Sequence, residues 1–247
     1  MTIPETIPDR MTKPGAEREG GGLGELYDAY FKTRFGYDPR RDLVWKEVVR
    51  WIQRRHIPES SRVLDLGAGY CNFINHVTAA ERHAVDVFSE FPAFAAPGVE
   101  PHVASATEMP FFGADRFDVA FASNLAEHLT RPDLILVLGE LRRVLRLGGT
   151  LILMQPNFKY CSTTYFDDYT HVQIFTDASL YDFLEAYGFR VRAVHPKFMP
   201  VNMKSTLRLR LPMLPLLVRT YLTMPFKPFA GQMLLVAENL KKGPGEL

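Results

Sequence analysis

The chain has little of what marks a disulfide-bonded, secreted or membrane-spanning protein. It contains only two cysteines among 247 residues, Cys71 and Cys161, and they form no CxxC pair. We therefore expect neither a disulfide framework nor a zinc site. We do expect the protein to reside in a reducing compartment. No apolar run approaches the roughly 18 residues needed to cross a bilayer. The N-terminus also lacks the apolar segment of a signal peptide, so we expect a cytoplasmic protein.

The chain also has almost no excess of positive over negative charge. The 29 Lys and Arg residues nearly balance the 28 Asp and Glu residues, and the formal net charge is +1. The chain as a whole is therefore not an obvious nucleic-acid-binding protein, and we expect no nucleic-acid partner. Its hydrophobic content of 47% is enough for one compact domain.

The most informative stretch is RVLDLGAGYCNF, at residues 62–73. Its short apolar run, ending at Gly67, is typical of a buried parallel strand. Gly67 and Gly69 allow the backbone to approach a ligand closely. A helix predicted over 71–80 would direct its first N–H groups to the same place. Together these features predict a nucleotide-type cofactor site at the carboxyl end of the first strand, although a tight turn without a ligand is the alternative.

Asp86 adds weight to the cofactor interpretation. It lies near the end of a second strand, predicted over 83–87. About twenty positions separate it from Asp65, the spacing at which an acidic residue accepts hydrogen bonds from ribose hydroxyls. The alternative is a turn residue at a strand end. A dinucleotide such as NAD is disfavoured, because Asn72 stands where that pattern needs a glycine.

The rest of the chain alternates between strand and helix patterns. Further strands are predicted over 99–104, 117–122, 150–155, 189–195 and 232–238, and helices over 25–35, 42–57, 131–145 and 176–187. Asp42 is the expected N-cap of the second helix and Pro58 its stop, while Thr176 or Asp177 opens the last helix and Gly188 closes it. This order predicts an α/β fold with a doubly wound, mostly parallel sheet.

A single domain is expected over 25–240, with N-terminal helices over 25–58. The polar segment 1–24, rich in Pro and Gly, is expected to be disordered.

Six segments in order resemble class I S-adenosylmethionine-dependent methyltransferases. They are VLDLGAGY, AVDVF, SATEMPF, FDVAFASNLAEHL, LRLGGTLILMQPN and FTDASLYDFLEAYGFRV, with GQMLLVAEN as the last strand. The resemblance covers roughly residues 62–192. It implies a Rossmann-like, seven-stranded sheet whose last strand is antiparallel and inserted beside the fifth. It also implies S-adenosyl-L-methionine as the cofactor.

The resemblance further implies which residues contact this cofactor. Position by position, these are Asp65, Gly67, Ala68 and Gly69 below the methionine part and ribose, Asp86 and Val87 at the ribose hydroxyls, Ser105, Ala106 and Thr107 at the adenine edge, and Asn124 and Leu125 beside the methyl group. Two positions depart from the family pattern. Cys71 stands where a third glycine is frequent, and Ser105 stands where aspartate is frequent.

Candidate catalytic residues follow the fourth and fifth predicted strands. The methyl group of a sulfonium is already activated, so a base is needed only when the acceptor is protonated at the working pH. His128 and His171 are the candidate bases. The segment YFDDYTH supplies candidate acceptor contacts at Tyr165, Asp167, Asp168 and Tyr169, with orientation of a histidine as the alternative role of Asp167 and Asp168. The alternatives are an ordinary polar loop and, for Glu127 and His128, a structural pair at a helix start.

The segment NLAEHL is also similar to the ExxEH segment of ubiquinone-biosynthesis O-methyltransferases, whose acidic residues and histidine hold a magnesium ion. Asn124 replaces the first glutamate of that segment. Since magnesium favours carboxylate ligands, we expect no metal here.

A basic and apolar insertion separates the last two predicted strands, over 197–230. No acidic residue occurs between Glu185 and Glu238. Prolines argue against one long helix in the insertion. The pattern is consistent with a lid over a hydrophobic or phosphate-bearing acceptor, with peripheral contact to an anionic membrane, or with a helical cover or dimer contact.

These features lead us to expect methylation of an oxygen atom in a small-molecule acceptor, such as a sugar or a lipid-linked glycan. An N-methyltransferase acting on an amine or a phospholipid headgroup is one alternative. A non-catalytic cofactor-binding or scaffold protein is another. The oligomeric state is left open.

Overall fold

The computed structural model describes residues 38–200 and 213–243, which all belong to the compact unit Tyr37–Leu247. The helix predicted over 25–35, the tail 1–24 and part of the insertion lie outside the described residues. No helix in the described ranges combines the length and apolar character that crossing a bilayer requires.

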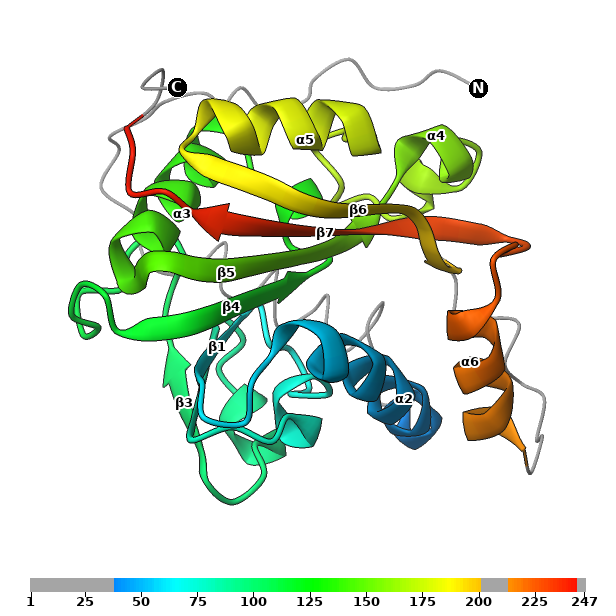
Figure 1. Ribbon diagram of the computed structural model, residues 1–247, viewed down its shortest axis with the longest axis horizontal. Helices are drawn as coiled ribbons and strands as arrows, with labels where there is room; N and C mark the ends of the chain where they lie inside the picture. Colours follow the sequence, from blue (N-terminus) through cyan, green and yellow to red (C-terminus); the bar gives the residue numbers. More distant parts are fainter. Residues whose placement is uncertain (1–37, 201–212, 244–247) are drawn as a thin grey trace, which may run out of the picture. The chain divides into compact units, whose positions relative to one another are not determined.

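A seven-stranded sheet forms the centre of this unit, in the order β3-β2-β1-β4-β5-β7-β6 (Figure 1). Six strands run parallel, and β7 runs antiparallel to β5 and β6. Their bounds are β1 Arg62–Leu66, β2 Glu81–Asp86, β3 Val99–Val103, β4 Phe117–Ser123, β5 Leu145–Pro156, β6 Phe189–Pro200 and β7 Ala230–Asn239. The predicted doubly wound sheet, with its antiparallel last strand beside the fifth, is confirmed.

Helices cover both faces of the sheet. They are α2 (Pro39–His56), α3 (Arg131–Val144), α4 (Phe158–Cys161), α5 (Asp177–Ala186) and α6 (Leu214–Thr223). In Figure 1, α5 lies above the sheet and α2 below it. Because side chains alternate along a strand, Leu64 and Leu66 join the core under α3 and α5, whereas Phe121 stacks on Phe73 and meets Trp45 of α2 edge-on.

The helix ends are mostly those that the sequence predicts. Thr176 caps α5 through a capping box, and Gly188 ends the turn after it with a φ of +83°. Asp42 is not the N-cap of α2, so that prediction was wrong. Asp38 caps the helix instead, by accepting from the Arg40 N–H at 3.0 Å. Pro39 fits the first helical position, since it has no N–H to leave unpaired.

The helix predicted over 71–80 is also wrong. The chain there forms turns and one short 3-10 helix, η1 (Ile74–His76). Gly69 and Cys71 have φ values of +53° and +56°, which a right-handed helix cannot include. The Asn75 side chain then ties the segment to 94–96, by donating to the Phe94 carbonyl and accepting from the Ala96 N–H, both at 2.8 Å. The loop after β1 therefore presents backbone and side chains, not a helix N-terminus.

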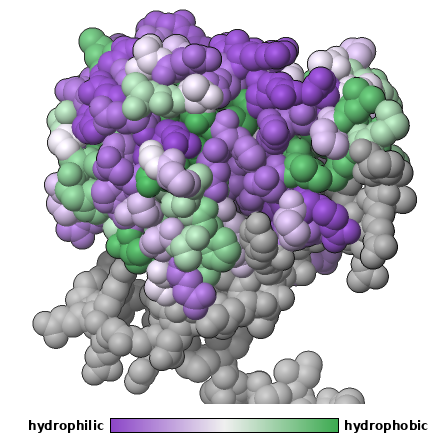
Figure 2. Space-filling view, turned by 90° about the horizontal axis from the view of Figure 1, so that it is seen from below, coloured by the Kyte–Doolittle hydropathy of each residue, from purple (hydrophilic) through white to green (hydrophobic). Residues whose placement is uncertain are grey.

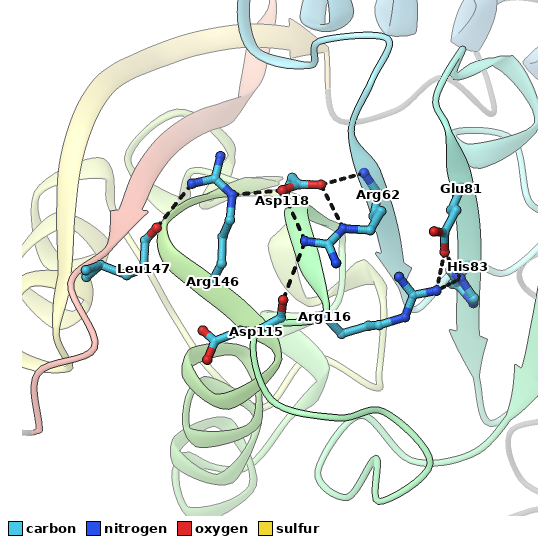
Figure 3. A network of polar contacts seen from close by, with 8 residues as sticks. All are labelled: Arg62, Glu81, His83, Asp115, Arg116, Asp118, Arg146 and Leu147. Carbon is cyan, nitrogen blue, oxygen red and sulfur yellow. Dashed lines mark hydrogen bonds and ion pairs between the residues drawn. The ribbon is translucent and has the colours of Figure 1, made fainter.

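A charged network fastens the strands at the amino edge of the sheet (Figure 3). Asp118 of β4 accepts hydrogen bonds from the Arg62 backbone N–H at 2.8 Å and from Arg146 Nε at 2.8 Å. Beside it, Arg116 pairs with Glu81 of β2. Burial opposes ionisation of Asp118, but the bonds from Arg62 and Arg146 outweigh it and hold the pKa of this carboxyl well below its usual value. The network thereby supports the pairing of β1 with β4.

We predict that Asp118→Asn destabilises the protein at pH 7 by about 1–3 kcal/mol, because charge-assisted hydrogen bonds to two arginines are lost. A carboxyl with a lowered pKa stabilises the fold above its unfolded pKa, and this contribution is lost as the pH falls. The difference between variant and wild type should therefore narrow from pH 5 towards pH 3. Urea unfolding at several pH values measures it. Asp115→Asn, at a more exposed neighbouring carboxylate, is the control and should change little.

Candidate active site

The predicted site residues come together at the end of the sheet that is formed by the carboxyl ends of its parallel strands, which we call the carboxyl edge. The loops after β1, β2, β3 and β4 all begin there, because these strands run parallel. The strand order reverses between β1 and β4, which makes this the switch point at which α/β sheets bind ligands. The predicted cofactor and catalytic residues therefore share one side of the domain.

The glycine loop after β1 is tightly held. Gly67 donates its N–H to the Val85 carbonyl at 2.9 Å and has a φ of +66°, a conformation in which an L side chain is strained. A Cβ atom at this position would lie 3.2 Å from Leu125 Cδ1. The loops after β1 and β4 therefore approach each other closely at Gly67, and Ala68 and Gly69 follow directly.

Asp86, at the end of β2, holds this loop in place. One of its carboxylate oxygens accepts from the Gly69 N–H at 2.7 Å, and the other accepts from the Phe88 N–H at 2.8 Å. Burial raises the pKa of Asp86, and the backbone hydrogen bonds oppose that shift. A carboxylate has further lone pairs, so Asp86 can also accept from a ligand on the loop. Val87, the next residue, is exposed.

Asp65 is a second buried carboxyl group beside the loop, and it lies within β1. Its Oδ2 atom has no hydrogen-bond partner among the described residues. Burial and, after it, the charge of Asp86 raise the pKa of Asp65 well above its usual value. A buried polar atom without a partner is costly, so the site fits a ligand that brings hydrogen-bond donors to Asp65 and Asp86.

The loops after β3 and β4 complete the predicted cofactor edge. Ser105, Ala106 and Thr107 are half-buried, and the Thr107 N–H donates to Ser105 Oγ at 3.2 Å. Asn124 has a φ of +51° and donates its N–H to the Met154 carbonyl at 2.8 Å. This fixes the turn in which Asn124 and Leu125 lie.

Gln232 was missed in the sequence analysis. It is buried in β7 and donates from Nε2 to Asn124 Oδ1 at 3.1 Å, while its Oε1 has no partner among the described residues. Because β7 runs antiparallel, its first residues reach the carboxyl edge of the other strands. Nothing in the sequence around Gln232 indicates a site residue. Only the antiparallel direction of β7 could have placed it there.

Two histidines meet beside this edge. His128 belongs to η3 (Ala126–His128) and His171 follows η4 (Tyr165–Asp167), and their ring centroids are 4.8 Å apart. Each ring hydrogen-bonds through Nδ1, His128 to Thr170 Oγ1 at 2.9 Å and His171 to the Tyr165 carbonyl at 2.6 Å. The predicted candidate bases are therefore neighbours.

The partners fix which nitrogen carries the proton in each neutral ring. Thr170 Oγ1 donates its single proton to Asp168 at 2.6 Å, so it can only accept from His128 Nδ1. A carbonyl also only accepts, so His171 Nδ1 is a donor too. Both neutral imidazoles then carry their lone pair on Nε2. Thr170 links His128 to the Asp168 carboxylate; the sequence analysis named Asp168 as a residue that could orient a histidine, but it did not find Thr170.

Glu127 directly precedes His128 in the chain and is fully buried. Neither of its carboxyl oxygens has a hydrogen-bond partner among the described residues. Burial raises the pKa of Glu127 to about 8, and the charge of Asp168 acts in the same direction. Near pH 7 this group is therefore mostly protonated and neutral.

The other residues of YFDDYTH differ in exposure. Tyr165 is buried, its hydroxyl donates to the Gln173 carbonyl, and its ring packs on Phe158 and His171. This arrangement supports the loop below His171. Asp167 and Tyr169 are exposed, whereas Asp168 is half-buried.

The cluster also has the composition of a metal site. One ligand atom each from Glu127, His128 and His171 lies within 4.8 Å of the other two. One carboxylate and two imidazoles are donors that divalent transition ions such as Zn²⁺ accept. The expectation of no metal therefore stays a prediction, which chelation can test.

Comparison with known proteins agrees with this geometry. A family model described as a methyltransferase domain matches residues 33–194. The chain belongs to this family. It is a methyltransferase that uses S-adenosyl-L-methionine. A search among curated proteins found no match.

Solved structures with this fold include S-adenosylmethionine-dependent methyltransferases from three organisms. One from Archaeoglobus fulgidus is 18% identical, with a TM-score of 0.56, and the match covers 86% of this chain and 99% of that one. One from Mesorhizobium loti is 15% identical, with a TM-score of 0.55, covering 78% and 96%. One from Thermotoga maritima, named as a possible histamine N-methyltransferase, is 16% identical, with a TM-score of 0.57, covering 89% and 96%. At sequence identities this low, the structural similarity shows a common fold and does not identify the acceptor.

The site residues fit this cofactor. Its amino group and ribose hydroxyls are donors, and the buried carboxyls Asp65 and Asp86 are acceptors beside a close-approach glycine loop. When bound, the cofactor supplies an activated methyl group on a positively charged sulfur. The protein's part is to orient both reactants and to exclude water.

We predict that Asp86→Asn weakens binding of S-adenosylhomocysteine at least tenfold and that Asp86→Ala weakens it further, because a charged acceptor for the ribose is lost. Calorimetric titration measures the affinity. Glu90→Gln, an exposed carboxylate on the same loop, is the control. Unchanged affinity in a folded Asp86→Asn protein would remove Asp86 from the ribose site.

Glu127 predicts a pH-dependent stability. Because its folded pKa lies near 8, the folded protein keeps a proton that the unfolded chain releases above about pH 4.3, so the free energy of unfolding falls as the pH rises between these values. Glu127→Gln cannot ionise. Its stability relative to wild type should therefore rise from pH 5 to pH 8.5, by up to about 1.4 kcal/mol per unit of pKa difference.

Thermal and urea unfolding of both proteins across this pH range provide the measurement. Glu108→Gln, at an exposed glutamate, is the control and should follow wild type. A constant difference between Glu127→Gln and wild type would mean that Glu127 is ionised throughout.

Proposed function

We propose that the enzyme methylates an oxygen atom of a small-molecule acceptor, such as a sugar or a lipid-linked molecule, and that His128 or His171 removes the acceptor's proton. The supporting observation is the paired imidazoles, whose Nδ1 atoms are both bound as donors. In the neutral form, each ring then carries its lone pair on Nε2, which is the atom that would accept the proton in this proposal. A hydroxyl acceptor needs such a base, because it is protonated at neutral pH.

The bonds behind His128 favour it over His171 as the base. As His128 gains a proton, its positive charge is stabilised through Thr170 by the Asp168 carboxylate. His171 is oriented by a neutral carbonyl instead, which stabilises an imidazolium less. The exposed Asp167 and Tyr169 remain candidate contacts for the acceptor, and Asp168 has its role through Thr170.

Methylation of an amine would depend less on these histidines, because the unprotonated fraction of an amine can react without a strong base. The similar structure from Thermotoga maritima is named as a possible histamine N-methyltransferase, and histamine is an amine. The two acceptor classes therefore differ in how strongly the reaction should depend on His128.

We predict that His128→Ala lowers the rate of methyl transfer by roughly 10²-fold or more, as expected for the loss of a general base, while affinity for S-adenosylhomocysteine is unchanged. Thr170→Val should lower the rate less, by about tenfold, because the base stays but its support is lost. Thr163→Val, an exposed threonine of the same segment, is the control. His171→Ala tests the second candidate in the same way.

Rates are measured with labelled S-adenosylmethionine and a panel of monosaccharide, lipid-linked and amine acceptors, with and without a chelator. Full activity of both histidine variants on a hydroxyl acceptor would contradict the proposed base. Loss of activity on chelation, restored by Zn²⁺ or Mn²⁺, would make the cluster a metal site instead.

A further inference from the structure

One cavity of the protein lies outside the residues assigned to methyl transfer. Its volume is about 570 Å³. It is bounded by the C-terminal half of α2, the end of β6, α4 and the end of α6 with the loop that follows. The side chains that characterise it are Trp51, Arg55, Tyr160, His195, Lys197 and Lys227. None of the residues proposed for cofactor binding or proton transfer lines it.

The cavity carries positive charge without an acidic counterpart. No Asp or Glu lines it, and Arg55, Lys197 and Lys227 have no ion pair with an acidic residue in the described ranges. Nearby cations outside the cavity do have an acidic partner. Arg50 of α2 and Arg219 of α6 both bond to the buried Glu47, at 3.0 Å each. The three cavity cations are thus left unneutralised by the described residues.

Backbone carbonyls and aromatic rings hold these cations in place. Lys227 Nζ donates to the Tyr221 and Leu222 carbonyls at 3.0 and 2.9 Å. The Arg55 guanidinium lies 4.1 Å from the centre of the Trp51 ring. An ammonium has three donors and a guanidinium five, so each keeps N–H groups for a ligand. The positions are set before a ligand arrives, which lowers the entropic cost of binding.

Lys197 completes the set. Its Nζ lies 4.5 Å from the centre of the Tyr160 ring, and Tyr160 belongs to α4. The cations also affect one another. Burial, and then the positive charge of Arg55, lower the pKa of Lys227, and His195 is affected likewise by burial, Lys227 and Arg55. Mutual repulsion of this kind is relieved when an anion binds among the cations.

We propose that this cavity binds a phosphate-bearing group, a diphosphate or a phosphorylated headgroup. Three cations that line one cavity favour a ligand with more than one negative charge and several acceptor oxygens, which a single carboxylate does not provide. The volume lies in the range of small-molecule sites. The assignment concerns a separate site, so it does not depend on which acceptor is methylated.

The same group can come from a free phosphorylated compound or from a lipid headgroup. Exposed apolar side chains belong to the same loop: Met224 lines the cavity and is 38% exposed, and Phe226, one residue after the lining residue Pro225, is 70% exposed. Figure 2 views the molecule from the side on which α2 and α6 lie in Figure 1, and its coloured hydrophobic residues occur in separate groups among hydrophilic ones. The two sources therefore have to be separated by experiment.

Calorimetric titration of the full chain with inorganic pyrophosphate tests the site. We expect saturable binding that Arg55→Gln combined with Lys197→Gln weakens at least tenfold. The control combines Lys46→Gln with Arg54→Gln, two exposed residues of α2 outside the cavity, and removes the same net charge. It should bind like wild type. Thermal unfolding establishes that both double variants are folded.

Sedimentation with phosphatidylcholine vesicles, with and without phosphatidylglycerol, gives the second arm. Pyrophosphate binding without vesicle binding supports the site and assigns a free phosphorylated ligand. Binding to the anionic vesicles that the cavity variant loses and the control keeps supports the site and assigns a lipid headgroup, and Phe226→Ser should then weaken it. The proposal is overturned if neither probe binds, or if both double variants lose binding equally.

Discussion

The parallel pairing of β1 with both β2 and β4 is the constraint on which the site depends. Leu66 lies opposite Val85 of β2 and Ala122 of β4, so the three strands end at nearly the same level. The glycine loop, Asp86 and the turn at Asn124 are therefore neighbours. A slip of one residue would turn Asp65 to the other face of the sheet. The charged network at Asp118 lies at the opposite edge and supports this register, so the site depends on contacts far from it.

Local sequence signals were sufficient for most elements, because their causes are local. The strands are short apolar runs, and Thr176 and Gly188 act within a turn of the residues that they cap. The helix over 71–80 failed for a physical reason. Its apolar spacing is helical, but Cys71 at its start has a left-handed conformation, and the Asn75 side chain bonds to the backbone of 94–96. Contacts between distant segments outweighed local preference there.

Part of the candidate site could likewise be predicted from the sequence, and part could not. The glycine loop and Asp86 could be placed from spacing and from the family resemblance. Gln232 and Asn124 are 108 positions apart, and Thr170 and His128 are 42 apart. No periodicity relates such pairs, so only the fold brings them together. The protonation pattern of the two histidines could not be predicted either, since it depends on whether each Nδ1 faces a hydroxyl or a carbonyl.

The electrostatic arrangement is consistent with transfer from a cationic sulfur to a hydroxyl. The described acidic groups near the carboxyl ends of the strands include Asp65, Asp86 and Glu127, all buried, whereas the described lining of the proposed phosphate site has three cations and no acidic residue. In the proposed reaction, the sulfur loses its positive charge when the methyl group is transferred. The proton of the acceptor hydroxyl moves to an imidazole, which becomes positively charged. Asp168 stabilises that charge through Thr170, and Glu127, neutral near pH 7, neither traps nor repels it strongly. A hydroxyl acceptor uses this arrangement fully, and an amine would not need it.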